Sequence, residues 1–344
     1  CAGTKNRWWA TEDIGVAQCV LPHLYHFGAN SFLLLSEQGE GLVIDPQRPD
    51  IELLAQLMEH LGVERISAAT ASHYHSDHSD GLNYVRTRWG AAVWLHPWVA
   101  EPIRDRDWLE VPWLPAESVE PDRLLPVEGR FRWNEYAFSI RPFPGQTWWH
   151  CAFDAEVDGE HVLFSGDNFQ PPSRWNGTGG FCAFNGSRFA EGFARSAQAV
   201  LDMAPSLICN GHGCIYPFSA DQYRRIVRWA AKSEECVRAL CSTDDWLSAY
   251  DPRALRLAPF VQRARPGQTL EVTAVLTNTS VRPVQIALSP IGPTGWKLRA
   301  ARVNVRLKRG ATRRVRIALS LPRTAAVGRY LCSIDSVSYT HLTL

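Results

Sequence analysis

Hydrophobic and polar positions follow two periods along the first two thirds of this chain. Mainly apolar runs at 32–35 and 41–45 are joined through a turn at 38–41 that contains two glycines, a pattern that predicts a β-hairpin. Apolar positions at helical spacing then lie between Asp50, a residue suited to capping a helix, and Gly62, a typical stop. We therefore expect strands and helices to alternate, beginning with a hairpin and an amphipathic helix.

The same kind of pattern continues as far as residue 240. Short apolar or alternating runs predict further strands at 66–71, 91–95, 131–140, 151–157 and 161–164. Apolar residues at helical spacing predict two more helices, over 189–201 and 219–240. Residues 97–126, which are rich in Pro and Trp, predict a long loop.

The pattern changes near residue 259, from which point only strand alternation continues. Apolar and basic side chains would face opposite sides over 302–308: Val303, Val305 and Leu307 against Arg302, Arg306 and Lys308. Arg314 and Arg316 repeat the alternation around Val315. Residues 1–258 carry 22 Lys and Arg against 33 Asp and Glu, a net −11, whereas residues 259–344 carry 14 against 2, a net +12. The second part therefore predicts a small all-β domain with one strongly basic face.

Three interpretations of this basic face stay open. It can dock on the acidic part of the same or another chain. It can bind an anionic polymer or surface, and this binding would weaken with salt. It can also be an Arg-rich, solvated face without a partner.

The candidate chemistry is concentrated in His73-Tyr74-His75-Ser76-Asp77-His78, which follows a predicted buried strand. Side chains two apart in extended chain point to the same side, so His73 and His75 can reach one metal ion. Asp77 and His78 are adjacent and diverge, which suits a second ion close by. Imidazole and carboxylate ligands favour a borderline cation such as zinc.

Three later segments each supply one more potential ligand. His150 follows a loop that contains Pro and Gly, whereas Asp167 and His212 follow short apolar runs that end in Gly. Open α/β layers place their functional residues at such carboxyl ends of strands. The three residues therefore belong with the first segment in one predicted site.

The order of these motifs, HxHxDH followed by His, Asp and His, resembles the metallo-β-lactamase superfamily over about residues 14–240. The resemblance implies an α+β fold, an αββα sandwich, with a catalytic domain over 14–242. The first metal would be held by His73, His75 and His150, the second by Asp77, His78 and His212, with Asp167 bridging both. Asp77 and Asp167 would be the catalytic carboxylates. After a linker over 243–258, residues 259–335 resemble small immunoglobulin-like β-sandwiches.

Departures from the family pattern narrow the choice of branch. Gln146 replaces a His that is not a usual ligand, so its loss costs little. Asp167 in place of Cys argues against the zinc β-lactamases that use a thiolate. His75 in place of Glu argues against the flavo-diiron oxygen reductases. The glyoxalase-II-like branch fits, and a mononuclear iron redox member of the same fold stays open.

The resemblance implies a dinuclear hydrolase in which a metal-bridging hydroxide attacks a small ester, thioester or lactone. Two zinc ions are the expected cofactors, with iron or manganese as alternatives. A phosphodiesterase acting on a nucleotide or RNA would use the same metals, with the basic domain holding the nucleic acid. A binding or scaffold protein is disfavoured, because the ligand set is intact.

Neighbours of the ligands are the candidate substrate contacts and supporting residues. Substrate contacts are expected from Trp148, Trp149, Asn168, Arg174 and Trp175. Asp45 and Asp80 are expected to accept hydrogen bonds from ligand imidazoles. The loop over 97–126 would cover the site.

The two ends of the sequence carry separate expectations. The chain begins with Cys1, so we expect a missing or processed start, with a cytoplasmic location slightly favoured over a secreted protein or lipoprotein. Residues 336–344 resemble a translated sequencing adaptor, so we expect a sequencing or cloning scar there and exclude them from the fold. No apolar stretch is long enough to predict a transmembrane helix.

Overall fold

The computed structural model describes residues 11–109, 111–169, 190–240, 254–293, 296 and 302–338. The chain forms two compact units, one of residues 1–106 and 111–239 and the other of residues 107–110 and 240–344. The boundary near 240 is close to the predicted end of the catalytic domain.

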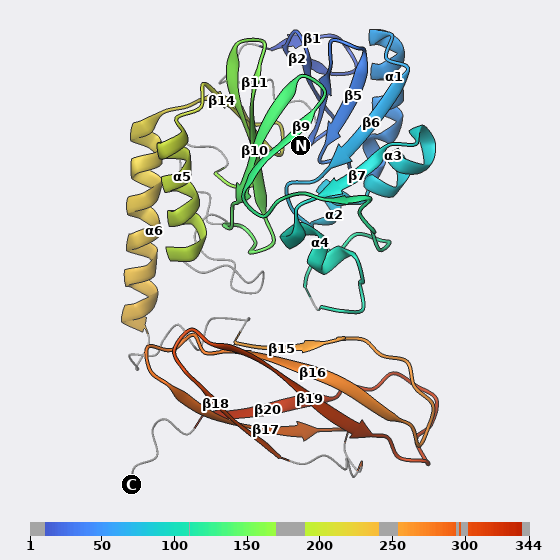
Figure 1. Ribbon diagram of the computed structural model, residues 1–344, viewed down its shortest axis with the longest axis vertical. Coiled ribbons are helices and arrows are strands. Elements are labelled where there is room, and N and C mark those ends of the chain that lie inside the picture. Colours follow the sequence, from blue (N-terminus) through green and yellow to red (C-terminus); the bar gives the residue numbers. More distant parts are fainter. Residues whose placement is uncertain are drawn as a thin grey trace. The chain divides into compact units, whose positions relative to one another are not determined.

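The first sheet of the N-terminal unit has eight strands in sequence order (Figure 1). They are β1 (Glu12–Asp13), β2 (Gln18–Leu21), β3 (Leu24–Phe27), β4 (Ser31–Leu35), β5 (Glu40–Ile44), β6 (Arg65–Thr70), β7 (Ala92–Leu95) and β8 (Arg123–Leu124). Strands β4 and β5 form the predicted hairpin, paired antiparallel. From β5 to β8 the strands run parallel, so their carboxyl ends share one edge.

The predicted first helix is α1 (Ile51–Leu61), and Gly62 ends it with a left-handed φ of 69°. Asp50 is the residue before the helix, but its side chain makes no capping bond. Its carboxylate instead accepts hydrogen bonds from the Ala29 N–H and the Gln47 side chain. The predicted capping role of Asp50 is therefore wrong, because its carboxylate is turned toward the turn that follows β3.

The second sheet has six strands in the order β14-β13-β12-β11-β10-β9. They are β9 (Gly129–Trp133), β10 (Tyr136–Pro142), β11 (Cys151–Val157), β12 (Glu160–Gly166), β13 (Leu207–Asn210) and β14 (Ile215–Pro217). Strands β12 and β13 are parallel neighbours. The segments that follow them therefore emerge at the same edge of the sheet.

Helices cover the outer faces of the two sheets, as the αββα prediction requires. In Figure 1, α1 and α3 (Leu82–Trp89) lie beside the first sheet, and α5 (Arg195–Met203) and α6 (Ala220–Leu240) lie beside the second. Residues of α5, α6 and the second sheet share one apolar core, with Val200, Ile208 and Tyr223 all fully buried. The fold of this unit is thus the predicted sandwich.

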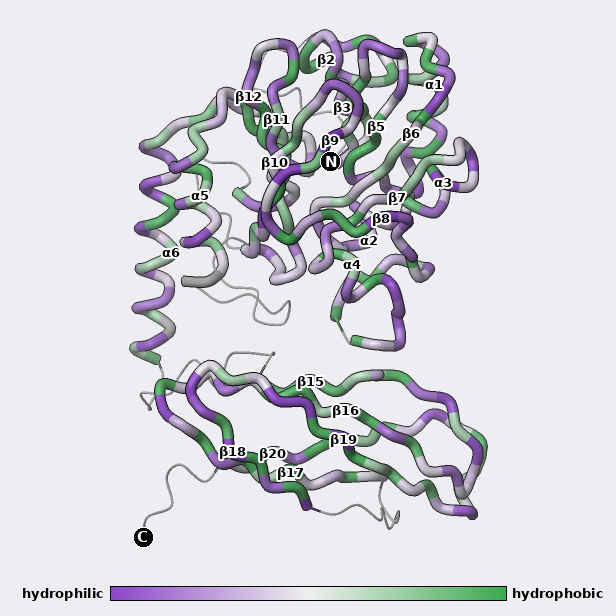
Figure 2. The backbone as a smooth tube through the Cα atoms, viewed as in Figure 1, coloured by the Kyte–Doolittle hydropathy of each residue, from purple (hydrophilic) through white to green (hydrophobic). Residues whose placement is uncertain are grey.

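Amphipathic patterning explains most of α6, in which hydrophobic and hydrophilic positions recur around the helix (Figure 2). Tyr223, Ile226 and Ala230, which recur at helical spacing, are buried. Leu240, the last residue of the helix, is 83% exposed.

The segment 97–126 is more ordered than a loop. It contains α4 (Pro97–Ile103) and β8, which pairs with β7. Pro97 is tolerated because the first turn of a helix needs no backbone donor at that position. The remainder still runs irregularly along the candidate site, where Ser76 N–H donates to the Trp113 carbonyl oxygen at 2.8 Å.

The C-terminal unit contains two three-stranded sheets, β15-β16-β19 and β18-β17-β20. The strands are β15 (Leu255–Ala258), β16 (Thr269–Thr277), β17 (Val284–Ile291), β18 (Val303–Leu307), β19 (Thr312–Ser320) and β20 (Ser333–Ser338). Their inward residues form a separate apolar core that includes Val305, Leu307 and Ile317. Two facing sheets with one core match the all-β prediction.

Two boundaries of this unit differ from the predicted ones. Residues 255–258, placed in the linker, form β15 because they pair with β16. Residues 336–338, excluded from the predicted fold, lie in β20 and pair with β17.

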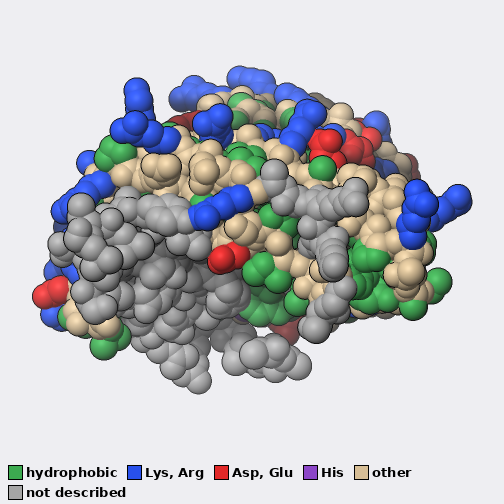
Figure 3. Space-filling view, turned by 90° about the horizontal axis from the view of Figure 1, so that it is seen from below, with side chains coloured by type: hydrophobic (Ala, Val, Ile, Leu, Met, Phe, Trp, Pro, Cys, Tyr) green, Lys and Arg blue, Asp and Glu red, His purple; other side chains and the backbone are tan. Residues whose placement is uncertain are grey.

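The alternation predicted over 302–308 is confirmed, because Val305 and Leu307 are buried and Arg306 is exposed. The prediction of one basic face is wrong. Strand β18 carries Arg306 on one sheet, and β19 carries Arg314 and Arg316 on the other, because the chain crosses between the sheets at 308–311. In the view of Figure 3, Lys and Arg side chains stand mainly along the upper edge and at both sides. An anionic partner stays a prediction.

Among the described residues, none of the helices combines the length and hydropathy that a membrane crossing requires.

Candidate metal centre

The first part of the site begins where β6 ends. His73 follows that strand and forms an isolated β-bridge with His150, and His75 is the residue before the short helix α2 (Ser76–Ser79), which carries Asp77 and His78. The rings of His73 and His75 lie 4.5 Å apart between centroids, and those of His73 and His78 lie 4.1 Å apart. The hexapeptide therefore brings three imidazoles together, and all three are buried.

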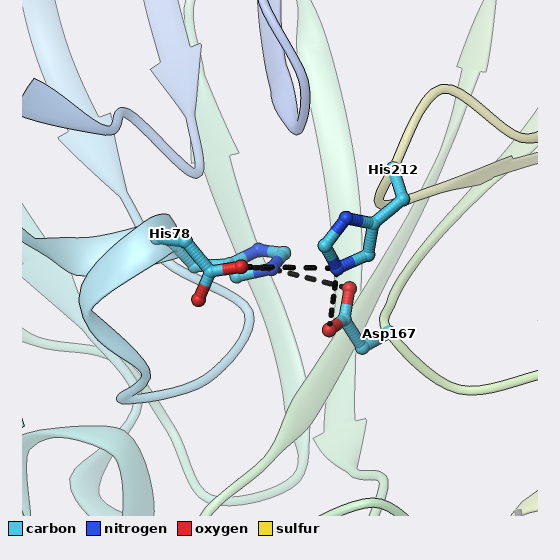
Figure 4. A group of neighbouring side chains, drawn as sticks. His78, Asp167 and His212 are labelled. Atoms are coloured by element: carbon cyan, nitrogen blue, oxygen red, sulfur yellow. Dashed lines mark hydrogen bonds and ion pairs between the residues drawn. The ribbon is translucent and has the colours of Figure 1, made fainter. Parts of the chain in front are cut away.

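The second part comes from the parallel strands β12 and β13. Asp167 follows β12 directly, and His212 lies in the turn after β13. His78 Nε2 lies 3.1 Å from Asp167 Oδ1, and His212 Nε2 lies 3.1 Å from Asp167 Oδ2. Figure 4 shows these three side chains pointing toward one another from α2 and the two strand ends.

Two groups of possible metal ligands share Asp167. One contains His73, His75 and Asp167, and the other contains Asp77, His78, Asp167 and His212. Within each group the ligand atoms lie within 4.8 Å of one another. Asp167, expected to bridge the two ions, belongs to both groups, whereas His150, expected to hold the first ion, belongs to neither.

His150 lies beside the first group in a stacked arrangement. Its ring is 4.8 Å from that of His73, with 12° between the planes. Gly166, with a φ of 51°, makes room for it, since a Cβ there would lie 2.5 Å from His150 Nε2. Gly211 does the same for Asp167, whose Oδ1 would lie 2.3 Å from a Cβ. Two glycines thus allow the backbone to approach the candidate ligands closely.

The nitrogen atoms of this cluster fit metal ligands. His73 Nε2 and both ring nitrogens of His150 are buried and make no hydrogen bond. Buried polar atoms in folded proteins nearly always have a partner, so these imidazole nitrogens without hydrogen bonds require an explanation. Coordination of a divalent cation satisfies them, and His and Asp are the donors that zinc uses.

The electrostatics of the cluster point to the same conclusion. Burial, with a contribution from neighbouring imidazoles, holds the pKa of His73 well below its ordinary value, and burial lowers the pKa of His150 to about 3. Burial opposes ionisation of Asp167, but His78 and His212 outweigh it, and its pKa lies well below the usual range. His73 and His150 are therefore neutral beside a charged carboxylate, and these are the protonation states that metal binding needs.

Of the two predicted supporting carboxylates, only Asp45 contacts a candidate ligand. Its Oδ2 lies 3.1 Å from His78 Nδ1, on the side of the ring away from Asp167, and it also accepts hydrogen bonds from Ser72. Burial lowers the pKa of His78, but Asp167 and Asp45 together raise it well above the ordinary value. Asp80 accepts instead from the Ala116 N–H at 2.6 Å, because it faces the 104–122 segment.

Trp148, Trp149 and Asn168, predicted as substrate contacts, all contact other residues of the chain. Trp149 is 2% exposed and donates through Nε1 to Glu101 at 2.9 Å. Asn168 is fully buried, accepting from the Gln146 N–H and donating to the Phe143 carbonyl oxygen. Trp148, partly buried, stacks on Trp98 at 4.6 Å. Trp149 and Asn168 therefore stabilise the segment around His150.

Arg174 and Trp175 lie outside the described residues.

Three residues of the site were not singled out for these roles by sequence. Gln146 Nε2 donates to Asp167 Oδ2 at 2.8 Å. Asn30, which precedes β4, contacts both Asp77 and the His212 backbone. Trp113 places its ring 5.0 Å from that of His75. Only Gln146 could have been predicted from the sequence, by its position four residues before His150. Asn30 and Trp113 lie far from the candidate ligands along the chain.

Comparison with known proteins gives the same fold. A β-lactamase from Chitinophaga pinensis aligns with a TM-score of 0.50 at 18% identity, over 69% of this chain and 98% of that one. A metallo-β-lactamase from Cronobacter sakazakii aligns with a TM-score of 0.50 at 16% identity, over 64% and 92%. At these identities the likeness shows the fold alone, so the argument against a β-lactamase stays untested.

One curated relative is a hydroxyacylglutathione hydrolase from Albidiferax ferrireducens. It is 26% identical over 144 residues, which are 41% of this chain and 48% of that protein. The chain thus spans about half the length of this relative.

Two sequence families match separate parts of the chain. The NPCBM-associated, NEW3 domain of alpha-galactosidase matches residues 264–335, within the all-β unit. The metallo-beta-lactamase superfamily matches residues 24–232, which include every candidate ligand. By this match and by its fold, the chain belongs to the metallo-β-lactamase superfamily.

Proposed function

We propose that this chain is a dinuclear metal-dependent hydrolase that acts on a small ester, thioester or lactone, with zinc as the metal. The observation that carries the proposal is Asp167, a buried carboxylate shared by two groups of candidate ligands. A lone metal site needs only one such group. Two groups with a common carboxylate favour two ions at short distance.

Ions bound there would supply a lowered pKa of coordinated water and polarisation of a carbonyl oxygen. The chain supplies the rest. Asp77 and Asp167 offset part of the cationic charge, and the remaining positive charge favours an oxyanion. Asp45 fixes the His78 ring by its contact with Nδ1, which leaves Nε2 to face Asp167.

The surroundings support a small acyl substrate with an apolar part. Trp113 is 55% exposed, and its ring meets that of His75 at 72°. An exposed aromatic face beside polar candidate ligands is suited to hold an apolar group near the reacting centre. The relative named for hydroxyacylglutathione favours an acyl compound as well.

The test joins metal analysis to a substrate panel. Purified protein is expected to contain two equivalents of zinc and to hydrolyse one class among thioesters, lactones and simple esters. Asp167→Ala should lose one equivalent and nearly all activity. Asp154→Ala is the matched control, because Asp154 is also a buried Asp of the second sheet but pairs with Arg141 and His161.

Other results would change the proposal. Full turnover by metal-depleted Asp167→Ala would overturn it. Hydrolysis of a phosphodiester alone, in the same panel, would favour the nucleotide or RNA alternative. A single equivalent of iron would favour a redox member of the fold.

A further inference from the structure

The four candidate ligands of the second group differ in how deeply their side chains are buried. The side chains of His78 and Asp167 are 0% and 2% exposed, so packing fixes them. The side chains of Asp77 and His212 are 40% and 41% exposed, and they come from different elements. Packing alone does not hold these two in place, so something else must set the distance between them.

Asn30 makes hydrogen bonds to both. Its Nδ2 donates to the Asp77 carbonyl oxygen at 2.9 Å and to Asp77 Oδ2 at 3.2 Å. Its Oδ1 accepts from the His212 N–H at 2.7 Å. One amide side chain therefore uses its donor on one exposed ligand and its acceptor on the other.

The position of Asn30 makes it a rigid support. Asn30 is 1% exposed and precedes β4, whose residue Phe32 is buried and paired with β5. Asp77 belongs to α2, which follows strand β6 of the first sheet, and His212 lies in the turn after β13 of the second sheet. Asn30 thus ties the two sheets together at the candidate site.

His212 has a particular need for such a contact. Its φ of 55° is in the left-handed region, which costs a residue with a Cβ about 1 kcal/mol or more. A hydrogen bond to its N–H helps to hold this backbone conformation and, with it, the direction of the imidazole. Asp77 and His212 then keep Oδ2 and Nε2 at 3.7 Å from each other.

We propose that Asn30 is a positioning residue for the second metal ion, setting Asp77 and His212 for joint coordination. The inference rests on the proposed two-ion site. Loss of an outer hydrogen-bond partner of a metal ligand typically weakens metal binding by about 10- to 100-fold. The weakening should fall on the second equivalent only, because the side-chain hydrogen bonds of Asn30 within the described residues go to Asp77 and His212, which belong to the second group alone.

The experiment measures zinc binding to the metal-free full chain by calorimetry, with metal content after dialysis as a second readout. Asn30→Ala removes the amide, and Asn30→Leu keeps a similar volume without hydrogen bonds. Both should retain the first equivalent with unchanged affinity and bind the second about 10- to 100-fold more weakly. A general loss of stability would not discriminate between the equivalents.

Asn278→Ala is the matched control. Asn278 is also buried, at 3%, and its side chain makes three hydrogen bonds, but it lies in the C-terminal unit. This variant should lose stability yet bind two equivalents normally. In the wild-type protein, the side-chain amide resonances of Asn30 should shift when the second equivalent is added and not with the first.

Wild-type affinity for both equivalents in the Asn30 variants, or equal weakening of both, would overturn the inference. So would amide resonances that respond to the first equivalent alone. A wild-type protein that binds a single equivalent would overturn both this inference and the two-ion proposal. Two equivalents without hydrolysis of any panel substrate would overturn the proposed activity and leave Asn30 in its role.

Discussion

Trp113 is the aromatic side chain that should shape substrate choice. Its ring lies 5.0 Å from that of His75, and its carbonyl oxygen holds the first turn of α2. Trp113→Ala should raise KM for an aromatic or long-chain acyl substrate about tenfold, with kcat and zinc content unchanged, because one apolar contact is worth about 1.4 kcal/mol. Steady-state kinetics over a series of acyl groups tests this.

Two further variants make the Trp113 result specific. Trp113→Phe should recover most of the affinity, since the aromatic face remains. Trp89→Ala, at a partly buried Trp on α3, should leave KM unchanged. An equal rise in KM for acetyl and aromatic substrates would argue against a contact with the acyl group.

Among single residues, the sequence predicted those candidate ligands that stand in short motifs or directly after strands. The pattern HxHxDH followed by His150, Asp167 and His212 named the residues that the fold brings together, because strand ends deliver them to one edge. Asn30 could not be found in that way. Its partners are 47 and 182 residues away, and no spacing rule connects an amide to ligands at that distance.

Among the elements, α4 depends on a buried histidine. His96 precedes the helix, and its Nδ1 accepts from the Trp98 N–H at 3.1 Å, so the proton lies on Nε2, which donates to the Val127 carbonyl oxygen at 2.8 Å. Burial lowers the pKa of His96 to about 4 from 6.5. The neutral ring therefore stabilises the folded state fully above pH 6.5.

This stabilisation is lost as pH falls from 6.5 toward 4, because only the unfolded state takes up the proton readily over that interval. The loss amounts to roughly 3 kcal/mol for a shift from 6.5 to about 4. His96→Asn keeps an acceptor for the Trp98 N–H but has no such titration. Urea unfolding of the metal-free variant should therefore depend less on pH than the wild type does.

The control is His60→Asn, at an exposed histidine near the end of α1, and it should keep the wild-type pH dependence. An unchanged pH profile in His96→Asn would show that other groups dominate acid sensitivity.

The elements predicted correctly are those with a sustained period, such as β11, α1 and the strands of the all-β unit. Helix α4 was missed because it has seven residues, two of them Pro, and no room for a clear apolar period. Strand β15 was missed because its pairing with β16, rather than its own composition, makes it a strand. Short elements fixed by tertiary contacts lie beyond the reach of local patterns.

At the scale of the whole molecule, the two units have separate cores and opposite charge. The cluster that includes Ile208 and Tyr223 is made only of residues from the N-terminal unit, and the cluster that includes Val305 and Ile317 only of residues from the C-terminal unit. Units with independent cores can unfold separately. A ligand bound by one of them should then stabilise that unit alone.

Metal removal tests this independence. All candidate ligands lie in the N-terminal unit, where His73 Nε2 and both ring nitrogens of His150 are buried without a hydrogen bond. At a free zinc concentration 100 times Kd, one bound ion stabilises the unit that holds it by about 2.7 kcal/mol. Chelation should therefore lower one calorimetric transition by several degrees, and added zinc should restore it, while the other transition stays in place.

Hydrogen exchange assigns the two transitions. Peptides from β6, α2 and β12 should lose protection on chelation, and those from β16 and β19 should not. Asn278→Ala should reduce protection in β16 and β19 and leave β6, α2 and β12 protected. Asn278 donates hydrogen bonds to the Arg282 and Leu307 carbonyl oxygens in the C-terminal unit. If chelation reduced protection in β16 and β19 as much as in β12, the two units would be energetically coupled, and the C-terminal unit would have a part in maintaining the metal centre.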